Sequence, residues 1–299
     1  MSENAYHNPV LLNYCTEALQ IRSNGIYVDV TFGGGGHSRE IFKHLTTGKL
    51  VAFDVDEDAA RNSIKSKRFT LIRKNFSELK KSLLEHQITE VDGIIADLGV
   101  SSHQFDSSER GFSIRFNSAL DMRMNKQVGI DAAEIIQHYS EENLKRIFRE
   151  YGELFNAHQV VKKIIENRNR ITTVNQLKEA ISGCVQKGKE NQFYAKVFQA
   201  LRIEVNNELN ALKELLIQGS ELLKPGGRMV VISYHSLEDR LVKNFFRSTK
   251  FEGEAEKDVY GNVMASLRSI TKKPIVPSDE EIEQNGRARS AKLRVAEKK

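Results

Sequence analysis

Four consecutive glycines, Gly33 to Gly36, and the following His37 form the segment best suited to hold a charged ligand. Glycine adopts positive φ without strain and lets the backbone approach a ligand closely. A helix that begins directly after such a turn offers unpaired N–H groups to an anionic or carboxylate group. A tight turn that binds nothing would use the same residues, so the glycines alone leave both roles open.

Two aspartates, Asp54 and Asp97, each follow a short apolar run. An acid after the second strand of a parallel sheet can accept hydrogen bonds from both hydroxyls of a ribose. We expect Asp97 to face the same crevice, because the carboxyl ends of parallel strands meet at one edge. Asp97 equally fits a helix cap, so its role stays open. Together the glycines and the two acids indicate a cofactor that contains adenosine.

The spacing of the glycines distinguishes between such cofactors. A dinucleotide fingerprint G-x-G-x-x-G that starts at Gly33 needs glycine at position 38, where this chain has Ser38. No hydride-transfer group is evident either. S-adenosyl-L-methionine fits better, with the glycine turn at its methionine end and Asp54 at its ribose. Asp97 then holds the cofactor or faces the reacting centre.

Other ligand motifs are incomplete. Residues 183–190 resemble a P-loop but carry Glu190 where a metal-binding hydroxyl is required. The segment that starts at Asp54 resembles an EF-hand loop but has Ala59 in place of glycine and Lys65 in place of glutamate. The eight histidines form no HExxH pair. We therefore expect no metal.

The order of the predicted elements positions these residues. Predicted strands are residues 25–32, 49–53, 69–72, 91–96 and 228–233. Helical patterns such as 38–45 separate the first strands, which is typical of βαβ units. From about 131 to 223 the pattern is helical. It contains two capping boxes (Asp131 with Glu134, Thr173 with Gln176) and one long helix over 193–216. Residues 250–285 are polar and irregular and are expected to form a loop or a mobile segment.

These elements predict an α/β protein: a Rossmann-like fold with an inserted all-helical domain. We expect a discontinuous cofactor-binding domain over 1–108 and 206–299, and a helical domain over 109–205 that recognises the substrate.

Composition favours a cytoplasmic protein. The chain is 39% hydrophobic and 28% charged, with no apolar run long enough to span a membrane and no secretory signal. The two cysteines, Cys15 and Cys184, lie far apart without metal-ligand spacing, which is typical of reduced thiols. The net charge of +5 is mild. Basic clusters nevertheless favour a polyanionic partner, although each alone also fits a solvated surface: 162/163, 168/170, 187/189 and 287–294.

Eight segments carry a resemblance to a known family. They read HNPVLL at 7–12, DVTFGGGGHS at 29–38, DLGVSS at 97–102, ERGFS at 109–113, LDMRM at 120–124, FQALRI at 198–203, SYHSLEDR at 233–240 and RARSAKLR at 287–294. In this order they resemble the bacterial RsmH/MraW family. The chain departs from many members at 118–119 and 191–196, which concerns substrate contacts more than the cofactor.

The resemblance implies a class I methyltransferase fold and a function. The family uses S-adenosyl-L-methionine to methylate the exocyclic N4 of a cytidine in the decoding region of 16S ribosomal RNA. The partner is then the small ribosomal subunit, and a homodimer stays open. By resemblance Gly35, Gly36 and His37 lie against the methionine portion, Asp54 takes the ribose, Phe76 flanks the adenine, and Asp97 and Gln104 complete the pocket.

No motif in the sequence identifies an amino group as the methyl acceptor. Many enzymes that methylate amines carry Asp/Asn-Pro-Pro-aromatic after the fourth strand, whereas this chain has Asp97-Leu98-Gly99-Val100. Our hypothesis is that Asp97 lies beside the target amine as acceptor or positioning group. Residues 101–123 would clamp an unstacked base, and basic helices over 140–190 would grip phosphates. The alternatives are a methyltransferase for another substrate, an RNA-binding assembly factor with a vestigial pocket and, third, a nicotinamide oxidoreductase.

Overall fold

The computed structural model describes residues 9–253, 255, 256, 258, 260 and 264–299. The chain forms two compact units. Unit 1 comprises Met1–Gly99 and Leu209–Lys299, and unit 2 comprises Val100–Glu208. The breaks therefore follow residues 99 and 208, where we expected them after 108 and 205. His7 and Asn8 of the first family segment lie outside the described residues.

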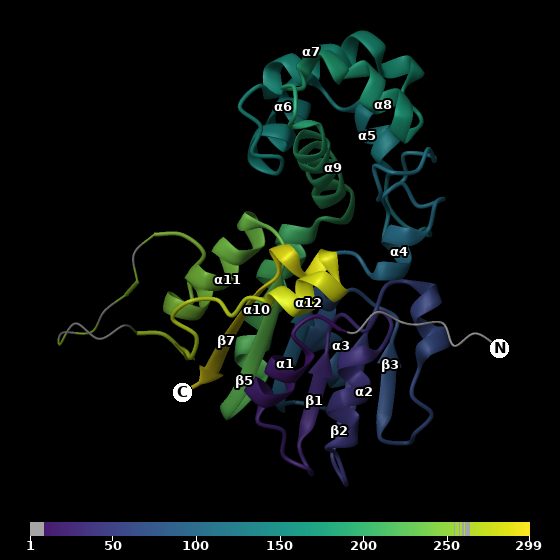
Figure 1. The fold of residues 1–299 in the computed structure, drawn as a ribbon. Helices are drawn as coiled ribbons and strands as arrows, with labels where there is room; N and C mark the ends of the chain where they lie inside the picture. The colour runs from purple at the N-terminus through teal and green to yellow at the C-terminus, as the bar shows by residue number, and fades with distance from the viewer. Residues whose placement is uncertain (1–8, 254, 257, 259, 261–263) are drawn as a thin grey trace. The chain divides into compact units, whose positions relative to one another are not determined.

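Unit 1 contains a seven-stranded sheet (Figure 1). Its strands are β1 (Ile26–Asp29), β2 (Lys49–Phe53), β3 (Phe69–Ile72), β4 (Val91–Asp97), β5 (Leu223–Ser233), β6 (Leu267–Ser269) and β7 (Lys292–Lys298). The spatial order is β3-β2-β1-β4-β5-β7-β6. The first five pair in parallel, and β7 runs antiparallel to both its neighbours. The chain order reverses between β1 and β4, where such sheets bind ligands at the carboxyl edge.

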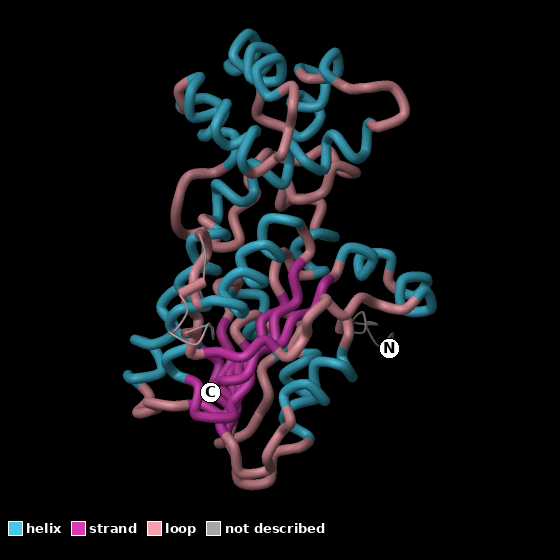
Figure 2. The backbone as a smooth tube through the Cα atoms, turned by 90° about the vertical axis from the view of Figure 1, so that its left-hand side faces the viewer, coloured by secondary structure: helices cyan, strands magenta, loops and turns pink. Residues whose placement is uncertain are grey.

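Helices cover both faces of this sheet (Figure 2). The helices of this unit are α1 (Leu12–Leu19), α2 (Gly36–Lys43), α3 (Leu79–Glu85), α10 (Glu208–Leu222), α11 (Ser236–Ser248) and α12 (Asp279–Gln284). Alternate strand residues enter two separate cores: Val28 and Ile94 pack with residues of α3, α10 and α11, and Tyr27 and Ile95 with residues of α1 and α2. A strand that is buried on both faces must be apolar throughout, which explains the short continuous runs. The predicted Rossmann-like fold is confirmed.

Unit 2 contains helices and loops, and none of the strands β1 to β7 lies in its described residues. Its helices are α4 (Ser102–Asp106), α5 (Ala132–His138), α6 (Glu141–Glu150), α7 (Ala157–Asn167), α8 (Val174–Ala180) and α9 (Glu190–Asn206). It has its own core, in which Ile135, Phe148, Val160 and Leu201 are buried. Both predicted capping boxes are present, at the start of α5 and of α8. The expected all-helical insertion is confirmed.

Two sequence predictions are wrong in detail. The single helix expected over 193–216 is broken, because α9 ends at Asn206, Asn207 adopts a left-handed φ of 51°, and α10 begins at Glu208. Asparagine tolerates that conformation, and the apolar positions continue on both sides and conceal the break. The loop expected over 250–285 contains the short strand β6 and the six-residue helix α12. Both elements are too short to give a recognisable hydrophobic periodicity.

None of the helices in the described ranges combines the length and the apolar composition needed to cross a bilayer.

Candidate active site

Side chains from the parallel strands gather at the carboxyl edge of the unit 1 sheet. Asp29 is the last residue of β1, Asp54 follows β2 directly, Asp97 is the last residue of β4, and Tyr234 follows β5. Phe76 begins a short 3-10 helix after β3. Because β2, β1, β4 and β5 are neighbours in the sheet, three carboxyl groups and one phenol share one edge.

The glycine turn begins α2 at this edge. Gly35 is the N-cap of α2 and has a φ of 74°, in the left-handed region. A Cβ at Gly35 would lie 2.8 Å from the Phe32 ring, and a Cβ at Gly36 would overlap Pro9. Arg39 Nη1 donates to the Gly34 carbonyl over 2.6 Å and fixes the turn from outside. The conformation therefore requires glycine at two successive positions.

Asp29 ties the end of β1 to α2. Its Oδ1 accepts from the Thr31 N–H over 3.0 Å, and its Oδ2 accepts from the Ser38 hydroxyl over 2.7 Å. Complete burial raises the pKa of Asp29, and the hydrogen bond from Ser38 opposes that rise. Ser38, which excludes a dinucleotide fingerprint, thus has a structural role.

Asp54 closes the other side of the glycine turn. Its Oδ2 accepts from the Gly33 N–H over 2.6 Å, and its Oδ1 accepts from the Asp56 N–H over 2.8 Å. Burial raises the pKa of Asp54 to about 6, against the effect of these two N–H donors. A carboxylate has about four lone-pair sites, so both oxygens can accept a further hydrogen bond.

Asp97 lies at the centre of the edge. Its N–H donates to the Thr31 hydroxyl over 2.6 Å, and its Oδ1 accepts from the Tyr234 hydroxyl over 2.7 Å. His37 Nε2 lies 3.6 Å from Oδ2 of Asp97. His37 is 7% exposed, and neither of its ring nitrogens has a hydrogen-bond partner among the described residues. A buried imidazole without such partners is costly, which is an indication of a ligand-binding position.

The remaining predicted site residues are Phe76 and Gln104. Phe76 is partly buried and packs against the unit 1 core. Gln104 belongs to unit 2, where its Oε1 accepts from the Ser101 N–H over 3.0 Å. The unit 1 edge therefore brings together Gly35, Gly36, His37, Asp54 and Asp97.

Sequence reasoning missed two members of this edge, Asp29 and Tyr234. Asp29 was missed because the predicted strand ran from 25 to 32 and placed this residue inside it, whereas β1 ends at Asp29. Tyr234 directly follows the predicted strand 228–233. Its aromatic character gave no indication of a polar partner 137 positions away.

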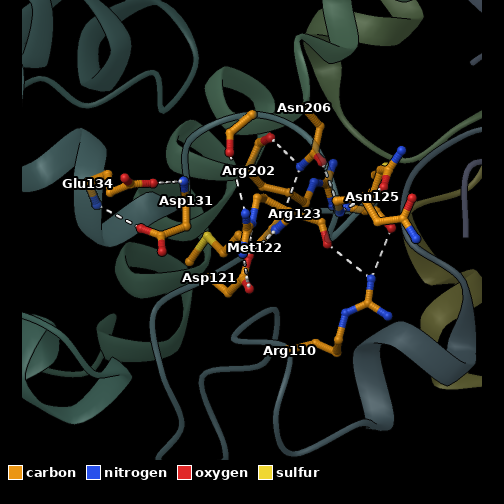
Figure 3. Close-up of polar contacts among 12 residues, drawn as sticks. Arg110, Asp121, Met122, Arg123, Asn125, Asp131, Glu134, Arg202 and Asn206 are labelled. Atoms are coloured by element: carbon orange, nitrogen blue, oxygen red, sulfur yellow. Dashed lines mark hydrogen bonds and ion pairs between the residues drawn. The ribbon is translucent and has the colours of Figure 1, made fainter.

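Unit 2 contains a second polar network, around the LDMRM segment (Figure 3). Met122 is fully buried and has a φ of 61°, a strained conformation for a residue with a side chain. Asn206, the last residue of α9, donates to the Met122 carbonyl over 2.8 Å and accepts from the Met124 N–H over 2.7 Å. Arg110 donates to the carbonyls of Arg123 and Met124, both over 3.0 Å. These contacts hold the loop in one shape.

The side chain of Arg123 is held within the same network. Its Nε and Nη2 donate to the two carboxylate oxygens of Asp121 over 2.7 and 3.1 Å. A bidentate pair of this kind fixes the plane of the guanidinium.

The predicted basic clusters contain arginines with structural contacts and lysines that are exposed. Arg168 donates to the carbonyls of Gln137 and Tyr139, and the buried Arg294 pairs with Asp239, so both have structural roles. Exposed lysines of unit 2 remain as candidates for phosphate contacts: Lys162, Lys187 and Lys189.

A family model and several sequence relatives match the chain over nearly its whole length. The model of the MraW methylase family matches residues 4–299. "Ribosomal RNA small subunit methyltransferase H" of Christiangramia forsetii is 54% identical over 296 residues, which is 98% of each chain. The protein of that name from Bacteroides thetaiotaomicron is 53% identical over 300 residues, 99% of each chain. Among solved structures, a putative rRNA-methylase from Clostridium thermocellum is 13% identical with a TM-score of 0.46, over 96% of this chain and 95% of that one.

Proposed function

Because the chain belongs to the MraW methylase family, we propose that it transfers a methyl group from S-adenosyl-L-methionine to N4 of a cytidine in the decoding region of 16S ribosomal RNA. The relatives named as small-subunit methyltransferases are more than half identical to it over almost their whole length. That identity is the observation that carries the proposal. It also supports a cytoplasmic location, where ribosomal subunits are assembled in bacteria.

The residues at the unit 1 edge fit this cofactor. When bound, it supplies an electrophilic methyl group on a positively charged sulfur. Three carboxyl groups at one edge favour a cation, and the buried nitrogens of His37 are available to polar groups of a ligand. Gly35, Gly36 and His37 would hold the methionine portion and Asp54 the ribose. Phe76 would flank the adenine.

Asp97 is the residue we place beside the target amine. The amino nitrogen of cytosine is a poor nucleophile, because its lone pair is delocalised into the ring. A hydrogen bond from the amine to Oδ2 of Asp97 would orient the nitrogen, and correct orientation alone can lower a barrier by several kcal/mol. The other oxygen of Asp97 already accepts from Tyr234.

Unit 2 is the part that we assign to RNA recognition. A base inside a helix must be unstacked before its amino group can react. The loop held by Asn206 and Arg110 has a fixed shape, which suits it to clamp such a base. Exposed lysines of unit 2, such as Lys162 and Lys187, would contact phosphates.

The test is methyl transfer from labelled cofactor to four substrates: small ribosomal subunits, total RNA, DNA and protein. We expect label only in ribosomal RNA, and mass spectrometry should locate it on one cytidine as N4-methylcytidine. Label in DNA or protein would favour another substrate. Binding to subunits without transfer would favour an assembly factor with a vestigial pocket.

A further inference from the structure

Tyr234 contacts the Asp97 carboxylate from the β5 side of the unit 1 sheet. It follows the last residue of β5, next to β4 in the sheet, and its hydroxyl donates to Oδ1 of Asp97 over 2.7 Å. The backbone around Tyr234 is fixed as well, because its N–H donates to the Glu238 carboxylate over 2.9 Å at the start of α11. The phenol therefore approaches Asp97 from a rigid position.

This contact makes the two oxygens of Asp97 unequal. Oδ1 is engaged by Tyr234, while Oδ2 lies 3.6 Å from His37 Nε2, beyond hydrogen-bond distance. The Asp97 N–H donates to Thr31, so the backbone of this residue is held from the β1 side. With the backbone and one oxygen fixed, the direction of the Oδ2 lone pairs is also fixed.

We propose that Tyr234 is a positioning residue, which orients the Asp97 carboxylate so that Oδ2 meets the N–H of the target amine. This inference rests on the proposed function and deepens it. In this proposal Tyr234 acts through Asp97 and needs no contact of its own with the reacting atoms.

The sequence around Asp97 explains why this support comes from another strand. The three residues after Asp97 are Leu98, Gly99 and Val100, none of which offers a side-chain donor. A Cβ at Gly99 would lie 3.7 Å from the Tyr234 ring, so the ring passes over the chain at Gly99. A donor that directly follows β5 thus reaches the carboxylate, and its ring lies beside Gly99.

The protonation state of the phenol suits this role. Burial and the nearby Asp97 carboxylate raise the pKa of Tyr234 well above its ordinary value. The hydroxyl therefore keeps its proton at neutral pH and acts as a donor.

The kinetic test compares Tyr234→Phe with the wild type on small ribosomal subunits. The change removes one hydroxyl and keeps the ring. We expect kcat to fall about 10- to 100-fold, since a displacement of about 1 Å in an active site can cost about 10²-fold. KM for subunits and the Kd for S-adenosylmethionine should stay within about threefold, and the melting temperature should show that the variant is folded. A wild-type kcat would overturn the proposal.

A double variant separates positioning from a general structural effect. If Tyr234 acts only through Asp97, then Tyr234→Phe should cost nothing further in an Asp97→Asn background. Multiplying losses would overturn the proposal. Tyr14→Phe is the matched control, because Tyr14 lies exposed on α1 of the same unit.

A measurement without turnover keeps the inference distinct from the proposed function. In protein labelled with ¹³C at aspartate carboxyls, the Asp97 resonance is assigned by its loss in Asp97→Asn. We expect Tyr234→Phe to shift this resonance and Tyr14→Phe to leave it unchanged. An unshifted resonance would overturn the inference. If the wild type transferred no methyl group to subunits, the proposed function would fail, and the carboxyl resonance would still decide whether Tyr234 orients Asp97.

Discussion

The sheet edge of unit 1 and the LDMRM loop of unit 2 are two polar networks that are built differently. At the edge, side chains contact one another, as Tyr234 after β5 contacts Asp97 and Ser38 of α2 contacts Asp29. In the loop, side chains of Asn206 and Arg110 mainly hold backbone groups. The edge thus fixes the directions of individual oxygens, whereas the loop fixes the path of a chain. We propose that the edge serves the chemistry and that the loop serves recognition of a shape.

The largest expected effect is at the centre of the edge. Asp97→Asn should lower kcat by at least about 10²-fold, within the range for a positioned group that contacts a transferred proton. Cofactor affinity, measured by calorimetry, should change little. Glu90→Gln, an exposed acid just before β4, is the matched control. A variant with normal affinity and normal rate would show that Asp97 does not face the amine.

A substitution in the glycine turn should weaken binding of the cofactor. Gly35→Ala places a side chain at positive φ and against Phe32, a strain of about 1–3 kcal/mol. We expect weaker binding of S-adenosylmethionine and a lower melting temperature. Gly183→Ala in unit 2 is the control, because a Cβ there meets nothing within 4 Å. Unchanged affinity would place the methionine portion elsewhere.

The next prediction concerns how the affinity for the cofactor at the sheet edge depends on pH. Asp54 has a pKa raised to about 6, so it is ionised above that pH and protonated below it. If the ionised form accepts from the ribose hydroxyls, affinity should be constant above pH 7 and fall by up to about tenfold per unit below pH 6. Calorimetry between pH 5 and 8 measures this. Asp54→Asn should bind weakly at every pH, and a flat profile for the wild type would argue against the ribose contact.

Loosening the LDMRM loop should weaken binding of the substrate and leave binding of the cofactor unchanged. Asn206→Ala removes the contacts to Met122 and Met124 and leaves buried backbone groups unsatisfied, at about 1–3 kcal/mol. We expect KM for ribosomal subunits to rise about tenfold while the Kd for S-adenosylmethionine stays constant. Asn175→Ala, on the exposed side of α8, should leave both unchanged. A loss of cofactor affinity would remove the distinction between the two networks.

The smallest effect is expected at a single surface lysine. Lys162→Ala should weaken RNA binding only a few-fold and lower the slope of log K against log salt by about 1. Filter binding at several salt concentrations measures the slope. Lys67→Ala, exposed in unit 1, serves as the comparison, and equal slopes for both variants would argue against a phosphate contact at Lys162.

Residues that follow a strand were the predictable part of the site. Asp54 and Asp97 were found because strand ends in a parallel sheet share an edge, and the family resemblance that added His37 is confirmed at the level of the family. Tyr234 was not found, because its partner lies on another strand and no local pattern encodes that pairing. The break at Asn207 was hidden for a related reason: a single left-handed residue leaves the apolar spacing on either side intact.

The parallel pairing of β4 with β5 has a consequence for the growing polypeptide. These strands are adjacent in space, yet 125 residues (223 − 97 − 1) separate the end of β4 from the start of β5. At about 5–20 residues per second, a ribosome takes roughly 6 to 25 seconds to make that stretch. Throughout this interval one side of β4 exposes unpaired N–H and carbonyl groups, which invite pairing with other chains. The segment up to β4, about a third of the chain, therefore carries an open strand edge while the helical unit is made.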